Sequence, residues 1–339
     1  MKKSLIYNII FTGALIFTIS GCSHETDTFD GPSLVDRFGP FSVLQDLEVS
    51  QSTVDFAAGE TAFFTAEFNK NVNWVLEITG TVSGAVKRIE GFERTLNATT
   101  ALWDGGTTDL PFFTSEVCDV VLTIPEEPSY LGTATIEALS TRSYADVGVL
   151  VTDFETAQPG VVQRNFDFKF SALTGRRDDI PAAEGDFFLF LEGTNNGAGD
   201  PFFIGLYEIL ASVTGETYIP VPTTIPEDLY FNFFVYSDGR PYGIAIVDFA
   251  VDTDDDGVFN ESVDAVINPF GETRLDWVGW RQISFPMSTL GNITQEQLEK
   301  LVALRLIMIS DDAQQPNPPE AVAYGADFMI FTSGGPLEL

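Results

Sequence analysis

The chain has almost no histidine. Its 339 residues include one, His24, which lies near the N-terminus and ahead of the strand-rich part of the sequence. Catalytic triads and Cys–His pairs need an imidazole, and many zinc, copper and haem sites use imidazole ligands. The sequence therefore excludes a histidine-based nucleophile system and a histidine-ligated metal site from the folded part of the chain.

Cysteine is nearly as scarce, with only Cys22 and Cys118 in the whole chain. Cys22 belongs to the N-terminal leader considered below, so Cys118 has no partner for an intramolecular disulfide. It stands in the strand-like run VCDVVLTI, where a lone cysteine most often serves as a small buried apolar side chain. We expect that role for Cys118.

Basic residues are few. There are 17 Lys and Arg against 50 Asp and Glu, giving a formal net charge of −33. Such a charge repels nucleic-acid phosphates and anionic headgroups, so the sequence predicts no nucleic-acid partner and no membrane contact except through a lipid. The chain is nevertheless 44% hydrophobic and 13% aromatic, which indicates a folded protein rather than a disordered acidic one.

The first 22 residues combine a basic start, a short apolar run and a small-residue processing site, as secretory signals do. Lys2 and Lys3 precede LIYNIIFTGALIFTI, which is shorter than the ~20 residues of a membrane-spanning helix. The segment ISGC ending at Cys22 resembles the bacterial lipobox. That resemblance implies a signal peptide over 1–21 and acylation of Cys22. Glu25 and Asp27, just after Cys22, resemble the acidic export signal of some Gram-negative glycan degraders, which implies a lipid-anchored protein of the outer membrane, exposed at the cell surface.

Residues 22–42 are polar, acidic and interrupted by two prolines, so they predict a flexible tether. From 43 to 148, short strand-like runs such as NWVLEITGTV alternate with turn residues, a pattern typical of an all-β sandwich. This segment resembles the immunoglobulin-like spacer modules of surface lipoproteins. From 149 to 339 a second set of runs, including LYFNFFVYSDG and YGIAIVDFAV, predicts another β-sandwich.

One segment has a helical pattern. In NITQEQLEKLVAL, Thr294 and Gln297 have the spacing of a capping box. Leu298, Leu301 and Val302 then share one helical face. We therefore expect a single short helix lying over one end of the second sandwich.

The second half resembles the jelly-roll, galactose-binding-like carbohydrate-binding modules. Three runs carry the resemblance: Asp153-Phe154-Glu155, the strands LYFNFFVYSDG and GIAIVDF followed by WVGWRQISFP, and YGADF starting at Tyr324. The resemblance implies a jelly-roll sandwich over about 150–335 that binds glycans. It also implies a structural Ca²⁺ between the first and last strands, held by Asp153 or Glu155 together with Asp327.

Aromatic and polar side chains in this half are the candidate ligand surface. Sugar rings stack on Trp and Tyr, and their hydroxyls need polar neighbours; such amphipathic rings are common anchors at interfaces. Strand alternation places Tyr230, Asn232, Phe234 and Tyr236 on one face, and the apolar Phe231, Phe233 and Val235 on the core face. The predicted ligand-binding residues are Tyr230, Asn232, Tyr236, Asp248, Trp277 and Trp280.

The densest acidic run is DTDDDG, beginning at Asp252. Carboxylates at alternate positions before a glycine are a way to wrap oxygen ligands around Ca²⁺. Asp252, Asp254 and Asp256 fit the start of such a loop, but an EF-hand is excluded because its position 12 is Val263 rather than Glu. A solvated acidic hairpin tip explains the same run, so both interpretations stay open.

The sequence thus favours a non-catalytic surface lipoprotein that captures a polysaccharide or oligosaccharide for uptake. Such a protein resembles the surface glycan-binding proteins of polysaccharide-utilisation systems, and that resemblance implies an outer-membrane importer and other surface glycan-binding proteins as partners. Two alternatives stay open: a protein-interaction or adhesion module, for which a flat apolar patch or a bare strand edge is expected, and a carboxylate-based glycoside hydrolase. No sequence motif singles out the two acids that such a hydrolase needs.

Overall fold

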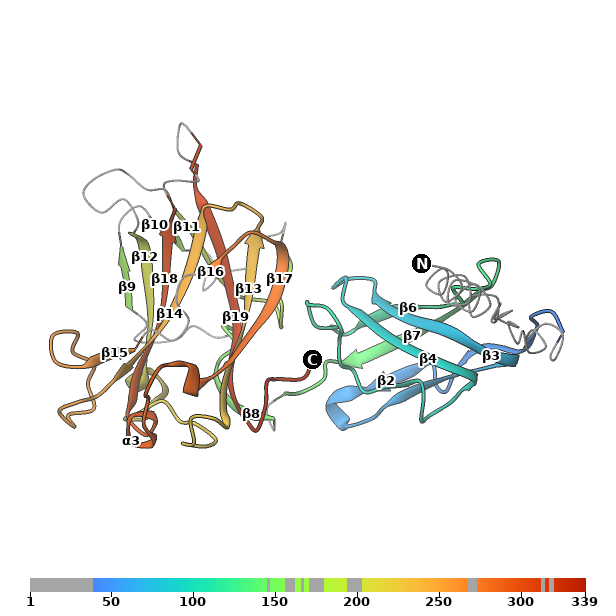
Figure 1. Cartoon of the computed structure of the whole chain (residues 1–339), viewed down its shortest axis with the longest axis horizontal. Coiled ribbons are helices and arrows are strands. Elements are labelled where there is room, and N and C mark those ends of the chain that lie inside the picture. The colour runs from blue at the N-terminus through green and yellow to red at the C-terminus, as the bar shows by residue number, and fades with distance from the viewer. Residues whose placement is uncertain are drawn as a thin grey trace, which may run out of the picture.

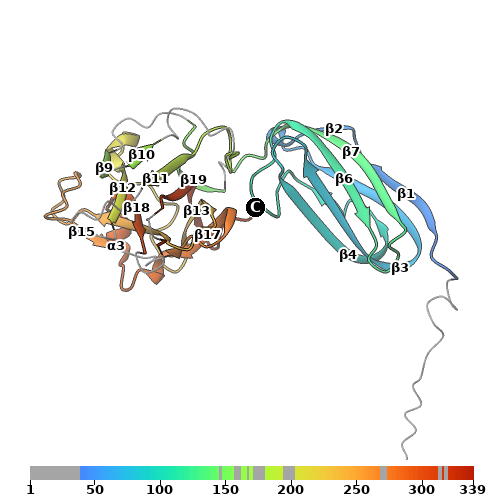
Figure 2. The same ribbon diagram turned by 90° about the horizontal axis from the view of Figure 1, so that it is seen from above.

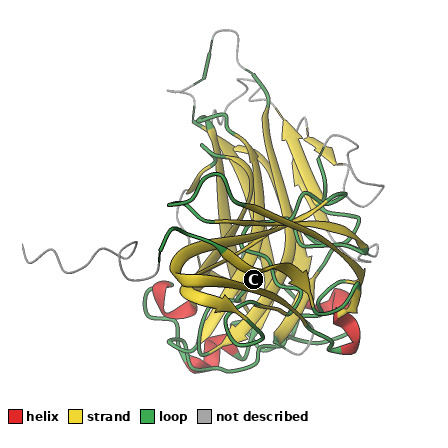
Figure 3. Ribbon diagram, turned by 90° about the vertical axis from the view of Figure 1, so that its right-hand side faces the viewer, coloured by secondary structure: helices red, strands yellow, loops and turns green. Residues whose placement is uncertain are grey.

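The structure is a computed structural model that describes residues 39–144, 147–155, 162–165, 168–170, 180–193, 203–267, 273–311, 315–316 and 320–339. Within these ranges its regular secondary structure is almost wholly strand (Figures 1 and 3), which confirms the predicted all-β fold class. The predicted signal peptide, Cys22 and most of the tether lie outside the described residues. None of the helices in the described ranges has the length and apolar character needed to cross a membrane.

The N-terminal sandwich is built from seven strands in the order β1-β3-β6-β7-β2, with β4 and β5 also paired to β3. Its first strand begins where the predicted tether ends. The strands are β1 (Val43–Val49), β2 (Thr53–Asp55), β3 (Ala62–Gly80), β4 (Val86–Leu96), β5 (Leu102–Trp103), β6 (Glu116–Thr123) and β7 (Leu131–Ser140).

The long strand β3 supplies side chains to the whole core of this sandwich. Its 19 residues alternate between buried and partly exposed on either side of Asn69, Lys70 and Asn71, where the alternation slips. The first half pairs with β1 and the second half with β6, so both halves face one core. Cys118 is fully buried there, and burial raises the pKa of its thiol to about 12, which confirms the apolar role predicted for it.

The C-terminal sandwich consists of two six-stranded sheets. Sheet I has the order β10-β11-β19-β13-β17, with β8 paired to β19; sheet II has the order β15-β14-β18-β12-β9, with β16 paired to β14. The strands of sheet I are β8 (Gly148–Thr152), β10 (Phe168–Phe170), β11 (Leu189–Gly193), β13 (Leu229–Asp238), β17 (Val278–Pro286) and β19 (Val322–Ser333). Those of sheet II are β9 (Val162–Asn165), β12 (Phe203–Leu210), β14 (Gly243–Val251), β15 (Ala265–Ile267), β16 (Thr273–Arg274) and β18 (Leu301–Ser310).

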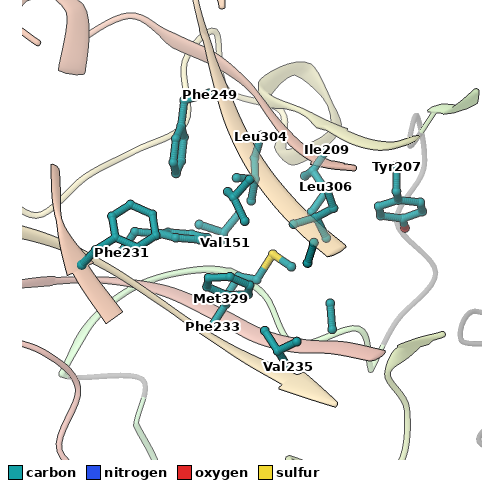
Figure 4. Packing of buried hydrophobic residues seen from close by; sticks show 14 of the residues in the cluster. Val151, Tyr207, Ile209, Phe231, Phe233, Val235, Phe249, Leu304, Leu306 and Met329 are labelled. Atoms are coloured by element: carbon teal, nitrogen blue, oxygen red, sulfur yellow. The ribbon is translucent and has the colours of Figure 1, made fainter. Parts of the chain in front are cut away.

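The two sheets enclose one apolar core (Figure 4). Phe231, Phe233 and Val235 of β13 point into it, as their alternation predicts, and meet Phe249 and Leu306 from sheet II. Full burial of one such side chain contributes about 1.5–3 kcal/mol. The inner faces of the two sheets therefore hold the sandwich together, and the opposite face of each sheet is left to other contacts.

The predicted helix is confirmed only in its first turn. Helix α3 (Gln295–Leu298) has the expected capping box between Thr294 and Gln297. The continuation into 301–304 is wrong, because these residues begin β18, which lies between β14 and β12. A central strand that is buried on both faces has a continuous run of apolar residues in its sequence. Such a run also contains the i, i+3, i+4 spacing of a helical face, so the pattern alone could not distinguish the two.

A small apolar cluster joins the two sandwiches. The C-terminus lies between the two sandwiches (Figures 1 and 2). Phe112, between β5 and β6, stacks on Tyr144 with ring centroids 4.6 Å apart. Phe112 also meets Phe234 of β13 at 5.2 Å, and Phe328 of β19 lies 6.0 Å from Tyr144. The backbone N–H of Phe112 donates to the Ala183 carbonyl at 2.8 Å, so the contact is both apolar and hydrogen-bonded.

Candidate functional site

The face of sheet I that points away from the core carries the predicted aromatic row of β13; we call it the outer face. Tyr230, Asn232, Phe234 and Tyr236 alternate with the core residues of this strand, as expected. A bulge in β19 lies beside them, because Asn232 pairs with Ile330 but Phe234 pairs with Asp327. The bulge sends Phe328 outward with a positive φ of 41°, so the outer face has its own aromatic packing.

Asn232 is fully buried and hydrogen-bonded within the protein. Its amide nitrogen donates to Thr332 Oγ1 at 2.9 Å, and its amide oxygen accepts from Ser284 Oγ at 2.6 Å and from the Leu337 N–H at 2.8 Å. Asn232 therefore fastens the C-terminal segment onto β13 and β19. This use of the side chain leaves it no exposed surface for a ligand, contrary to the role the sequence suggests.

Toward the C-terminal end of β13, beyond the part covered by the C-terminal segment and Phe328, the outer face opens into a cavity of about 200 Å³. Its floor spans three neighbouring strands, because Phe190 of β11 and Tyr236 of β13 both pair with Gly325 of β19. Of the predicted ligand residues, Tyr236 alone lines it. The lining residues are Ile180, Phe190, Glu192, Tyr236, Asp238, Arg240 and Ala323.

An ion pair forms one side of this cavity. The Arg240 Nε lies 2.9 Å from Asp238 Oδ2, and the backbone N–H of Arg240 donates to Asp238 Oδ1 at 3.2 Å. The Arg240 guanidinium also donates to the Ala321 carbonyl. These contacts fix the orientation of both side chains beside the Tyr236 ring. The sequence placed Tyr236 here but missed Asp238, Arg240 and Glu192, although Asp238 is the next residue on the same strand face.

Trp280 lies next to the cavity and packs across the sheet. From β17 its indole meets the edge of Tyr236 at 5.5 Å and Phe188 at 5.2 Å, and its Nε1–H donates to the Pro181 carbonyl at 2.8 Å. The ring passes over Gly325, where an added Cβ would lie 3.2 Å from it. Gly325 is therefore the position that lets the indole approach β19.

Two other predicted ligand residues lie elsewhere. Trp277 is 7% exposed within the core, donates to the Gly279 carbonyl at 3.0 Å and lies under the Arg281 guanidinium at 4.9 Å. Asp248 belongs to sheet II, where it pairs across the strands with Arg305. The structure thus separates Trp277 and Asp248 from the Tyr236 cavity.

The acidic run after β14 does bring its carboxylates together. One oxygen from each of Asp252, Asp254 and Asp256 lies within 4.8 Å of the others, and such hard oxygen donors fit Ca²⁺. Burial acts to raise the pKa of Asp252, but hydrogen bonds from the Gly257 N–H and the Tyr218 hydroxyl outweigh it and leave that pKa lowered. Asp252 therefore also organises the loop as an acceptor.

The second predicted Ca²⁺ set organises another loop. Asp327 Oδ2 accepts from the N–H groups of Ala183 and Glu184, each at 3.0 Å. Glu155 Oε1 accepts from the N–H groups of Asp186 and Phe187 at 2.7 and 2.8 Å. The two carboxylates hold the segment 183–187 from both of its ends.

Like charges surround this second set. Burial, followed by the charges of Glu155 and Asp153, raises the pKa of Glu184 to about 7, and burial raises the pKa of Asp327 well above its usual range. Glu184 is a member that the sequence did not reveal. Within the described ranges, Asp153, Glu155 and Asp327 do not form a trio as tight as the one at Asp252.

Comparisons with known proteins give distant likenesses. No protein-family model and no curated protein sequence matches the chain. A structure of carbohydrate-binding modules from the β-sandwich superfamily aligns at 12% identity and a TM-score of 0.37, covering 86% of this chain and 98% of that one. SGBP-B from a xyloglucan utilization locus in Bacteroides uniformis aligns at 16% and 0.34, covering 87% and 73%.

The CBM22-1 xylan-binding domain from Paenibacillus barcinonensis Xyn10C aligns at 14% identity and a TM-score of 0.33, covering 56% of this chain and 96% of that domain. At these scores, the likenesses establish neither a family nor a ligand for this chain.

Proposed function

We propose that this protein is a non-catalytic glycan-binding protein whose site is the cavity over β11, β19 and β13. The observation that carries the proposal is the combination of a tyrosine ring with fixed polar groups. Tyr236 supplies an amphipathic ring, and Asp238, Arg240 and Glu192 supply charged oxygens and N–H groups around a cavity of about 200 Å³. Such a set matches a sugar, which has an apolar ring face and a rim of hydroxyls.

Binding at this cavity would combine ring stacking with hydrogen bonds to hydroxyls. Arg240 donates from a rigid guanidinium and is held by Asp238 and the Ala321 carbonyl, so little side-chain freedom is lost when a ligand arrives. The Trp280 indole, fixed by the Pro181 carbonyl, keeps the Tyr236 ring in place from the side. The expected affinity is modest because one cavity and one ring provide little buried area.

We also propose that the protein is exposed at the cell surface, anchored to the outer membrane by a lipid on Cys22. In this arrangement the N-terminal sandwich acts as a spacer that lifts the cavity from the membrane. An importer and other surface glycan-binding proteins are the partners proposed for uptake. Labelling with radioactive palmitate, compared between the wild type and Cys22→Ala, tests the anchor: loss of label in the variant supports it.

A structural Ca²⁺ at Asp252, Asp254 and Asp256 is part of the proposal. Their carboxylates would hold the ion, which would supply positive charge that neutralises the loop and steadies it. Desolvation and then the Asp256 carboxylate raise the pKa of Asp254, so a bound cation would relieve repulsion within the loop. The matching experiment is a melting curve with Ca²⁺ and with a chelator, on the wild type and on Asp254→Asn/Asp256→Asn.

The test of glycan binding is retardation of the purified full chain in gels that contain soluble polysaccharides. The panel holds xylan, xyloglucan, mixed-linkage β-glucan, mannan and pectin. We expect one glycan class to retard the protein and Tyr236→Ala to lose at least tenfold in affinity. Phe92→Ala, an exposed ring on the N-terminal sandwich, serves as the control and should bind like the wild type.

The same panel separates the alternatives. Absence of retardation by every glycan, together with absence of calorimetric binding to partial hydrolysates of the same glycans, with the protein folded, contradicts glycan binding and favours the protein-interaction function. Release of reducing sugar from a retained glycan would instead indicate a carboxylate-based hydrolase. Retardation without release, abolished by Tyr236→Ala, supports the proposal.

A further inference from the structure

We propose that the Tyr236 cavity recognises the end of a glycan chain, or a short oligosaccharide, rather than an internal stretch of a polysaccharide. The inference rests on the glycan-binding function proposed above and specifies its ligand. It follows from which parts of the outer face of sheet I are covered along β13. We call each outward-facing residue of β13, with its partners on the neighbouring strands, one level; the upper levels are those at the C-terminal end of the strand. Successive levels along β13 are marked by Asp238, Tyr236, Phe234, Asn232 and Tyr230.

The two upper levels are open to the cavity. Asp238 and Tyr236 line it together with Phe190 and Glu192 of β11 and Ala323 of β19. The cavity is smaller than the ~300 Å³ at which sites for drug-sized ligands begin, so it holds about one sugar ring. A site for several consecutive rings would need a longer groove.

The indole of Trp280 marks the lower edge of the cavity. It reaches from β17 past Tyr236 to Phe188, at the level of Gly325, and its Nε1–H is tied to the Pro181 carbonyl. Ile180 lines the cavity, whereas the backbone of Ala183 is bound to Asp327. The segment from 180 to 183 therefore crosses the outer face together with the indole and forms a wall.

Below this wall the outer face is already occupied. Phe112 and Tyr144 of the N-terminal side pack on Phe234 and Phe328. One level further, the Leu337 N–H is bonded to the buried Asn232. A glycan chain entering the cavity therefore cannot continue along β13, because the N-terminal sandwich and the C-terminal segment fill its path.

This arrangement fixes how a long chain can approach. An internal residue carries a glycosidic bond on both sides, so its site must leave room for the glycan chain in two directions. A terminal residue carries one such bond and can enter a cavity that is closed below. The cavity size and the wall both fit the terminal residue.

Binding capacity per gram of glycan distinguishes the two modes. The probe is a glycan of the panel, compared as intact polymer and after partial hydrolysis to chains ten times shorter. Titration calorimetry at equal mass gives the number of binding sites. Recognition of ends predicts about tenfold more sites per gram in the hydrolysate, at an unchanged affinity per site.

Other results overturn the inference. Equal or fewer sites per gram in the hydrolysate would mean internal recognition, with glycan binding itself intact. Absence of binding to both forms would overturn the proposed function and the inference with it. Tyr236→Ala should abolish binding of both forms and Phe92→Ala should preserve it; full binding by Tyr236→Ala would place the site elsewhere.

Discussion

Asp248 and Arg305 are nearly buried and lie opposite each other in the strand register on the outer side of sheet II. They face each other across β14 and β18 and are 6% and 7% exposed. Arg305 also contacts Glu208 at 3.3 Å and Glu261 at 3.1 Å. Burial raises the pKa of Asp248 to about 6, and the charge of Arg305 acts in the opposite direction. Folding therefore disfavours the ionised form of Asp248 relative to its protonated form.

The sign of the pH effect follows from that raised pKa. Protonated Asp248 favours the fold, so its contribution is complete below the ordinary value of 3.8 and is lost as pH rises through about 6. Asp248→Asn should flatten the curve of melting temperature against pH between about 4 and 7. The exposed Asp119→Asn is the control. A curve for Asp248→Asn as steep as that of the wild type would contradict this assignment.

At the scale of elements, strand β19 depends on a missing side chain at Gly325. An added Cβ would lie 2.7 Å from the Tyr236 Cβ and 3.2 Å from the Trp280 ring. Gly325→Ala should overpack the site, cost about 1–3 kcal/mol and weaken glycan binding. Gly335→Ala is the matched control, because nothing lies within 4 Å of its Cβ. Thermal melting and calorimetry check both variants, and a fully stable, fully binding Gly325→Ala would refute the packing argument.

The same elements show how far the sequence could predict the structure. Alternation in β13 placed Phe231 and Phe233 in the core and Tyr236 on the outer face, because period 2 is a local property. It could not show that Asn232 is covered, since the covering segment comes from 105 residues further along the chain. For the same reason the helical pattern extended wrongly past α3, where pairing with β14 and β12 makes Leu301 part of a strand.

At the scale of the whole molecule, the two sandwiches behave as one body if the cluster at their junction is intact. Phe112 and Tyr144 are 7% and 4% exposed and pack against the rings of Phe234 and Phe328, which stack on each other. The Arg142 guanidinium lies 5.0 Å from the Tyr144 ring and 3.0 Å from Asp104, which steadies the N-terminal side of the contact. Interfaces between domains are usually more polar and allow relative motion, whereas this one has an aromatic centre.

Phe112→Ala tests this coupling. Truncating a buried phenylalanine costs roughly 3–5 kcal/mol, and here the loss falls on the contact between the sandwiches rather than on either core. We expect the wild type to unfold in one calorimetric transition and the variant in two, with a larger radius of gyration by X-ray scattering. The exposed Phe92→Ala should retain one transition and the wild-type radius. One unshifted transition in Phe112→Ala would show that the aromatic cluster does not couple the sandwiches. In that case the segment from 180 to 183 alone would hold the wall below the Tyr236 cavity.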